Sequence, residues 1–129
     1  MQYLWIGLGG FLGANARFLV QAWAASRWGA DFPYGTLLAN ISGSFIIALF
    51  LTLATGRLAV SPELRLFVAV GFLGGFTTFS SFSLETFRLI EQSGWWSASL
   101  YFFGNTLLGL LGVLLGVGLA QLIQGVGGG

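Results

Sequence analysis

The stretch GGFTTFSSFS, residues 74–83, places two glycines, two threonines, three serines and three phenylalanines in the middle of an otherwise apolar run. Paired glycines weaken a helix, and threonine side chains can hydrogen-bond to nearby backbone groups instead of letting the helix continue. The stretch therefore predicts a helix that breaks near Gly74–Thr78. Backbone groups freed by a break in hydrocarbon must be satisfied by protein or by a wet cavity.

The composition of the whole chain explains why hydrocarbon is the expected surrounding. Of the 129 residues, 56% are hydrophobic and 7% are charged, and the mean hydropathy is +0.87. Soluble domains carry about 25% charged residues. The sequence indicates an all-α integral membrane protein that crosses the bilayer several times. Its length fits one domain over residues 1–129, with about four spans of about 20 residues each.

Turn residues and polar clusters divide the chain into four apolar segments. Pro62 and Glu63 mark the expected start of the third helix, and tryptophans fall near the segment ends, as aromatic belts do. The glycine-rich residues 123–129 are expected to form a disordered tail. The four predicted transmembrane helices cover residues 3–25, 35–55, 64–90 and 95–123.

The missing residue types exclude several kinds of chemistry. The chain has no cysteine and no histidine, and only four carboxylates. Thiol nucleophiles and sulfur-ligated metal sites are therefore excluded, and general acid–base catalysis has few groups to use. We expect the protein not to be an enzyme.

The expected break would create two half-helices near the middle of the membrane. The carbonyls at the end of the first suit a small hard cation, and the amides at the start of the second suit an anion. Past the break, Phe79 and Phe82 share one helical face because they stand three residues apart. An aromatic ring is positive at its edge, so edges turned to a pore would attract an anion. The alternative, that both rings only pack in the bundle, stays open at this stage.

Other polar side chains also fall inside apolar segments. Asn40 and, one turn before it, Thr36 lie in the second segment, where an unpaired amide is costly. Asn40 either joins two helices or donates its NH₂ to a passing anion. Glu85 is the one carboxylate well inside the third segment, where it could orient donors, cap a vestibule or link helices. Arg17 either raises the anion concentration at a vestibule or extends to the headgroups.

This set of polar residues is rich in donors and poor in titratable groups. Proton-coupled transporters usually need acidic or histidine relays in their spans, and only Glu85 is available. A small four-span proton-coupled exporter, the alternative class, needs a carboxylate in its first span, which residues 3–25 lack. A non-transporting scaffold would leave the break unexplained. The residues favour passive movement of a small anion.

The arginines give no preferred orientation in the membrane. With four spans, Arg57 and Arg65 fall on the side of the N-terminus, and Arg27 and Arg88 fall on the other side. The positive-inside rule predicts an orientation from an excess of basic residues on one side, and here the two sides carry equal numbers. Either a partner fixes the topology, or the chain inserts both ways and pairs with an inverted copy.

Two sequence blocks carry a specific resemblance. GTLLAN, residues 35–40, followed by GFLGGFTTFSSFSLE, residues 71–85, resembles the Fluc, or CrcB, family of fluoride channels, and the resemblance covers nearly the whole chain. It implies an antiparallel, dual-topology homodimer with two fluoride pathways. It also implies passive fluoride export across the cell inner membrane, which relieves fluoride toxicity. The expected partners are fluoride, a second copy and the lipid bilayer, with no nucleic acid.

The resemblance also implies roles for individual residues. Phe79 and Phe82 would turn their ring edges to fluoride, and Asn40 would donate its amide. The backbone carbonyls of Gly74 and Thr77 would hold a structural sodium ion, the one expected cofactor, at the dimer centre. No role is assigned to Tyr101, Asn105 or Thr106. The remaining positions of the implied pathway are Thr36, Ser80, Ser81, Ser83, Glu85 and Arg17.

Overall fold

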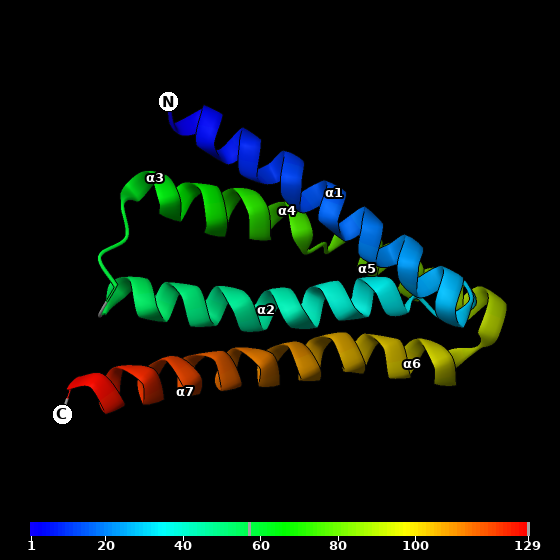
Figure 1. Ribbon diagram of the computed structural model, residues 1–129. Helices are drawn as coiled ribbons and strands as arrows, with labels where there is room; N and C mark the ends of the chain where they lie inside the picture. The colour runs from blue at the N-terminus through cyan, green and yellow to red at the C-terminus, as the bar shows by residue number, and fades with distance from the viewer. Residues whose placement is uncertain (57, 129) are drawn as a thin grey trace.

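The protein is a helical bundle, shown as a computed structural model in Figure 1. The structure describes residues 1–56 and 58–128, the last three of these by their backbone alone, and the described residues contain no strand. Two of the elements, η1 and η2, are π-helices that lie within longer helical runs. In chain order the elements are α1 (Gln2–Trp28), α2 (Tyr34–Thr55), α3 (Pro62–Arg65), η1 (Leu66–Leu73), α4 (Gly74–Phe76), α5 (Ser80–Ser93), α6 (Trp95–Phe103), η2 (Gly104–Leu108) and α7 (Gly109–Gly128).

The ends of the long helical runs follow from local sequence. Gly29 and Gly94 take φ values of 85° and 96°, which favour glycine, and they terminate α1 and α5. At the start of α3 the Ser61 hydroxyl accepts a hydrogen bond from the Leu64 N–H at 3.1 Å, and Pro62 occupies the first turn. The helix start expected at Pro62 is therefore confirmed.

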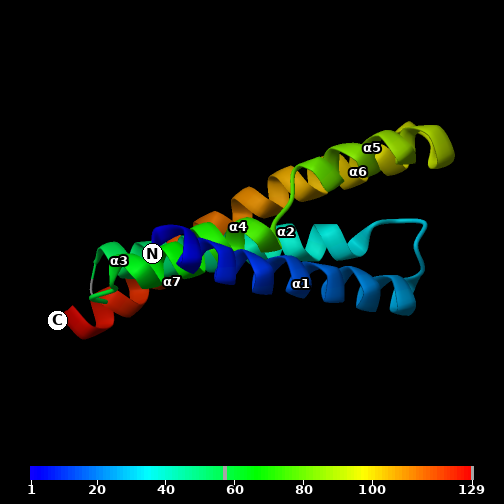
Figure 2. The same ribbon diagram turned by 90° about the horizontal axis from the view of Figure 1, so that it is seen from above.

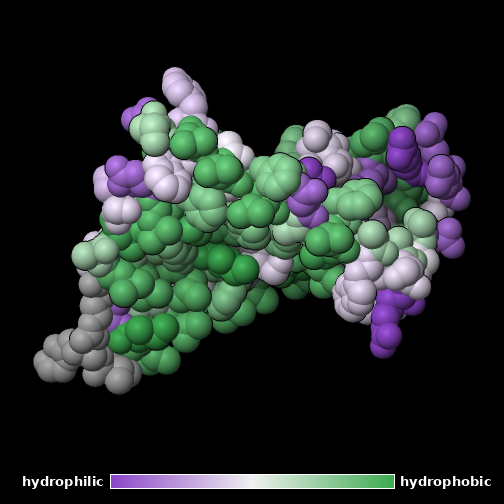
Figure 3. Space-filling view, turned by 45° about the horizontal axis from the view of Figure 1, so that its top comes forward, coloured by the Kyte–Doolittle hydropathy of each residue, from purple (hydrophilic) through white to green (hydrophobic). Residues whose placement is uncertain are grey.

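Three of the runs are long and apolar enough to cross a membrane: Tyr34–Thr55, Pro62–Ser93 and Trp95–Gly125. The fourth, α1, has 27 residues but is less apolar, since it carries Arg17 and Gln21 on its length. Both of these side chains bond to neighbouring helices. Figure 3 shows a broad hydrophobic band, with hydrophilic residues gathered towards the ends of the molecule. The all-α membrane protein predicted from composition is confirmed.

The break predicted near Gly74–Thr78 is present, and it falls on the threonines. Gly74 remains helical, with φ −63° and ψ −37°, and the chain becomes extended at Thr77, with φ −88° and ψ 156°. The glycines serve packing instead of the break. A Cβ at Gly75 would lie 2.9 Å from the Gly10 carbonyl oxygen on α1. The break predicted near Gly74–Thr78 is therefore confirmed, with both glycines still inside the helix.

Both termini lie at the same end of the bundle as α3 (Figure 1). Arg65 ends α3 at this end, whereas Arg27 lies in the last turn of α1 and Arg88 in α5, towards the other end. These three arginines fall where the sequence placed them. Arg57 lies outside the described residues.

The last helix extends through most of the segment that was expected to be a disordered tail. α7 continues to Gly128, and Gly129 lies outside the described residues. Near this end the Gln124 amide donates to the Thr52 carbonyl at 3.3 Å, which ties α7 to the end of α2. This contact between helices favours a helical backbone at the C-terminal end, and composition alone did not reveal it.

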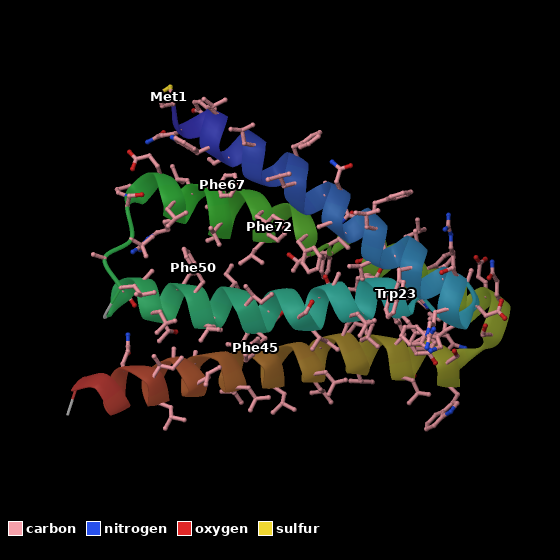
Figure 4. All side chains as sticks on the ribbon, in the orientation of Figure 1. Met1, Trp23, Phe45, Phe50, Phe67 and Phe72 are labelled. Carbon is pink, nitrogen blue, oxygen red and sulfur yellow. The ribbon has the colours of Figure 1, made fainter. Side chains whose placement is uncertain are left out.

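Glycines let the helices approach closely, because they have no side chain to keep two backbones apart. A Cβ at Gly13 of α1 would overlap the carbonyl oxygen of Phe72 in η1. On the other side of the bundle, a Cβ at Gly116 of α7 would lie 2.5 Å from the Phe45 carbonyl oxygen. Figure 4 shows Phe45 between α2 and α7. The glycines thus fix the pairs of helices that carry the polar residues.

Gly13→Ala should lower the free energy of unfolding by about 1–3 kcal/mol, because the added methyl meets backbone that cannot move aside. Gly7→Ala is the matched control on the same helix, since a Cβ there meets nothing within 4 Å. Thermal unfolding in detergent would compare the two variants. Equal midpoints for both would contradict the close contact of α1 with η1.

Candidate functional site

Two hollows lie at and near the break. Figure 2 shows α5 and α6 leaning away from α1 and α2, and a cavity of about 340 Å³, the end cavity, lies between α1, α2 and α5. A wider groove of about 520 Å³, the central groove, runs past the break itself. The end cavity is lined by polar side chains that include Gln21, Thr36, Ser81, Glu85 and Arg88. The central groove is lined by Asn40, Gly74, Thr77, Phe79, Phe82 and Asn105, among others.

A chain of hydrogen bonds crosses the wall of the end cavity. The Gln21 amide donates to the Thr36 hydroxyl at 3.0 Å, and that hydroxyl donates to Glu85 Oε1 at 2.8 Å. The Tyr101 hydroxyl donates to Glu85 Oε2 at 3.3 Å. Glu85 therefore joins α2, α5 and α6, and its two oxygens orient two hydroxyls. Of the roles that the sequence left open for Glu85, orienting donors and linking helices are both present.

Asn40 clamps the broken segment. Its Oδ1 accepts from the Thr78 N–H at 2.9 Å, and its Nδ2 donates to the Thr78 carbonyl at 3.2 Å. The same Nδ2 donates to Asn105 Oδ1 at 2.9 Å. The amide that the sequence marked as costly is thus fully hydrogen-bonded, and it satisfies backbone groups that the break has freed.

The threonines of the break hydrogen-bond locally, as expected. The Thr77 hydroxyl donates to the Leu73 carbonyl at 2.9 Å, and the Thr78 hydroxyl accepts from the Ser81 N–H at 3.2 Å. Thr78 therefore provides the first turn of α5 with a side-chain acceptor. These contacts explain why the chain leaves the helix at Thr77 and resumes it at Ser80.

The carbonyls at the end of the first half-helix divide into two kinds. The Arg17 Nε donates to the Gly75 carbonyl at 3.1 Å, so this arginine enters the bundle instead of extending to the headgroups. In the part of the chain that the structure describes, the carbonyls of Gly74 and Thr77 accept no hydrogen bond. Both residues line the central groove. Oxygen ligands of this kind, at the negative end of a half-helix, fit a small hard cation.

The two phenylalanines have very different surroundings. Their ring centroids are 5.8 Å apart, which confirms the shared face. Phe82 is 8% exposed and contacts the rings of Tyr101 and Phe102, whereas Phe79 is 78% exposed. Phe82 therefore has a packing role within the chain. Phe79 does not, and this argues against packing inside one chain as its reason for being there.

The serines of the implied track are only partly brought together. Ser81 lines the end cavity with Thr36 and Glu85. Ser80 and Ser83 lie on the exposed side of α5 and line neither hollow. Their place in an anion pathway stays a prediction.

Comparison with known proteins identifies the family. Residues 4–117 match the family described as "CrcB-like protein, Camphor Resistance (CrcB)". The chain belongs to the CrcB family. The matched residues include the break and both hollows, so the resemblance predicted from residues 35–40 and 71–85 is confirmed.

Curated relatives agree with this assignment to the CrcB family. A protein named "Fluoride-specific ion channel FluC" from Roseiflexus sp. is 49% identical over 123 residues, which are 95% of this chain and 99% of that protein. A protein with the same name from Acidobacterium capsulatum is 45% identical over 91% of this chain and 94% of its own length. Another, from Anaeromyxobacter dehalogenans, is 50% identical over 85% of this chain and 86% of its own length. The relatives are named as channels, in agreement with the expectation that this chain is not an enzyme.

Three residues of this CrcB chain belong to the site although the sequence did not assign them to it. Gln21 lies four residues after Arg17, so both lie on the same side of α1, and that spacing was the available signal. Tyr101 and Asn105 have the same spacing in the last run. Tyr101 hydrogen-bonds to Glu85, and Asn105 accepts a hydrogen bond from Asn40. Only the arrangement of the helices shows these contacts.

Proposed function

We propose that the protein is a fluoride-selective channel through which fluoride leaves the cell passively, which relieves fluoride toxicity. The observation that carries the proposal is the clamped break, where the amides of Asn40 and Asn105 and the rings of Phe79 and Phe82 line one groove. The names of the curated relatives support fluoride as the ion. Together with the apolar runs, they support a place in the cell inner membrane.

The chemistry of the two hollows suits this anion. Fluoride is small and strongly hydrated, so a pore must replace its water shell with donors at close range. Amide, hydroxyl and ring-edge hydrogens do this at low net charge, which leaves binding weak enough for exit. Arg17 and Arg88 would raise the anion concentration near the end cavity. Thr36 and Ser81 would lead fluoride on to Asn40, Phe79 and Phe82, and the hydroxyls of Ser80 and Ser83 would extend this track.

A second, inverted copy would complete the pathway. Phe79 is 78% exposed in one chain, and the central groove is open along its side. An antiparallel partner would cover both, and two copies would then enclose two equivalent pathways. The near-equal distribution of arginines over the two ends supports insertion in both directions.

A sodium ion would fit the carbonyls of Gly74 and Thr77, because neither oxygen accepts a hydrogen bond from the residues that the structure describes and both residues line the central groove. When bound, sodium would offset the negative ends of the half-helix dipoles of both copies. In each chain the Asn40 clamp and the Thr77 hydroxyl hold the backbone that presents these oxygens.

Liposomes that hold the purified protein should release fluoride rapidly when valinomycin carries potassium as the counter-charge. A fluoride electrode would record the efflux, and chloride release would serve as the control for selectivity. Efflux should persist with the proton gradient collapsed, which separates a channel from a proton-coupled exporter. Well-folded protein that releases no fluoride, or releases both ions equally, would contradict the proposal.

A further inference from the structure

Asn105 is an amide buried inside an otherwise apolar run. It is 8% exposed, and it lies in η2, between α6 and α7. π-helical turns within α-helices occur frequently at functional sites. The Nδ2 of Asn105 donates to the Tyr101 carbonyl at 3.0 Å, which fixes the amide and leaves its Oδ1 directed at Asn40.

The hydrogen bonds of Asn40 show what this oxygen does. A primary amide has two N–H donors and one carbonyl oxygen. Thr78 engages the carbonyl oxygen and one donor, so the backbone of the break already fixes the orientation of the amide. The remaining donor meets Asn105 Oδ1 at 2.9 Å. Asn105 therefore contributes nothing further to the orientation of Asn40; it occupies the one N–H that an anion could use.

We propose that Asn105 sets the fluoride affinity of the channel, because its side-chain oxygen competes with fluoride for the second N–H of Asn40. This inference rests on the proposed function, since it concerns an anion in the central groove. Both residues line that groove together with Phe79 and Phe82. Fluoride that reaches Asn40 replaces Asn105 Oδ1 as the acceptor of the second N–H. This N–H of Asn40 therefore has an acceptor before, during and after the exchange.

The exchange keeps binding weak. A buried N–H without an acceptor is costly, so a donor left free in the empty channel would gain strongly from fluoride. With Asn105 in place, the net gain is only the difference between two acceptors. Conduction requires that an ion bind well enough to enter and weakly enough to leave. Asn105 thus tunes fluoride affinity by acting through Asn40.

Removal of the competing oxygen should change affinity in a defined direction. In Asn105→Ala, the fluoride concentration that gives half-maximal efflux should fall about fivefold, the effect of one typical hydrogen bond, while the maximal rate does not rise. Asn105→Leu removes the same acceptor while keeping a side chain branched at Cγ, and it serves if the alanine variant folds poorly. Asn105→Asp, which keeps an acceptor and adds negative charge, should raise the half-maximal concentration.

The test is the initial rate of efflux from proteoliposomes over a range of internal fluoride concentrations. Asn15→Ala is the matched control, because the Asn15 amide donates only to the Phe11 carbonyl of its own helix, at 2.7 Å, and should leave the curve unchanged. A merely structural role for Asn105 would lower the maximal rate without lowering the half-maximal concentration, and that result would overturn the inference. A conducting wild type with unchanged half-maximal concentration in both acceptor-free variants would also overturn it, while the proposed function stood. A wild type that moves no fluoride would remove both.

Discussion

Asn40→Asp should cut the initial rate of fluoride efflux by at least about a hundredfold, the combined effect of two lost hydrogen bonds to buried acceptors. In the native protein the Asn40 Nδ2 donates to the Thr78 carbonyl and to Asn105 Oδ1. Aspartate would place an oxygen against both of these oxygens. An ionised carboxylate would also add negative charge in the path of an anion, where charge is costly.

Efflux from proteoliposomes measures this effect, and the elution volume and melting temperature in detergent show whether the variant has folded. Asn15→Asp is the matched control, since it makes the same chemical change in α1, at a side chain that bonds only to its own helix. We expect efflux close to wild type from the control. If Asn40→Asp conducted as well as the control, Asn40 would be a structural residue and the proposed pathway would have lost its central donor.

Phe79→Ala should reduce fluoride efflux at least about tenfold, the factor that corresponds to about 1.4 kcal/mol, with little change in the stability of the chain. Its ring is 78% exposed, so its removal leaves no cavity within one copy. Phe82→Ala should also reduce efflux. Because this ring is 8% exposed and packs on Tyr101 and Phe102, that variant should in addition lose about 3–5 kcal/mol of unfolding free energy.

Phe79→Leu separates the two explanations for the exposed ring. Leucine keeps an apolar side chain of similar reach but has no positive ring edge. If the edge attracts fluoride, the leucine variant should lose efflux as the alanine variant does. If Phe79 only packs against another copy, the leucine variant should retain most of the fluoride efflux. Phe11→Ala, which removes another exposed ring from α1, is the control for general effects on the bilayer-facing surface.

The sequence predicted the helical runs well where proline or glycine marks their ends. The second span, expected over residues 35–55, is observed as Tyr34–Thr55, between Pro33 and Gly56. The break near Gly74–Thr78 was predicted because glycines and hydroxyl-bearing residues cluster in an apolar run. The sequence did not show that both glycines stay helical, because Gly75 packs against the backbone of Gly10, and a contact between distant segments leaves no local signal.

The sequence predicted the residues of the candidate site but not the contacts between distant segments that join them. Composition and spacing singled out Asn40, Thr36, Glu85 and the phenylalanines, since polar groups in hydrocarbon need partners. They did not show that Asn40 would meet Thr78 and Asn105, because that depends on the rotation of α2 relative to α5 and the last run. The π-helices η1 and η2 also have no periodic pattern from which they could be predicted.

The turn at η2 has a consequence for how this chain can change in length. A π-helical turn holds an extra residue compared with an α-helix, and each residue of an α-helix advances the chain by about 100°. α6 meets α5, and α7 meets α2, so the turn at η2 lies between two faces that pack on different neighbours. A single deletion within Gly104–Leu108 would remove the extra residue and restore a regular helix, while Gly112 and Gly116 would keep their place against α2. The loss of one residue should therefore be tolerated better here than in the α-helical turns on either side, where one deletion rotates the rest of the helix by about 100°.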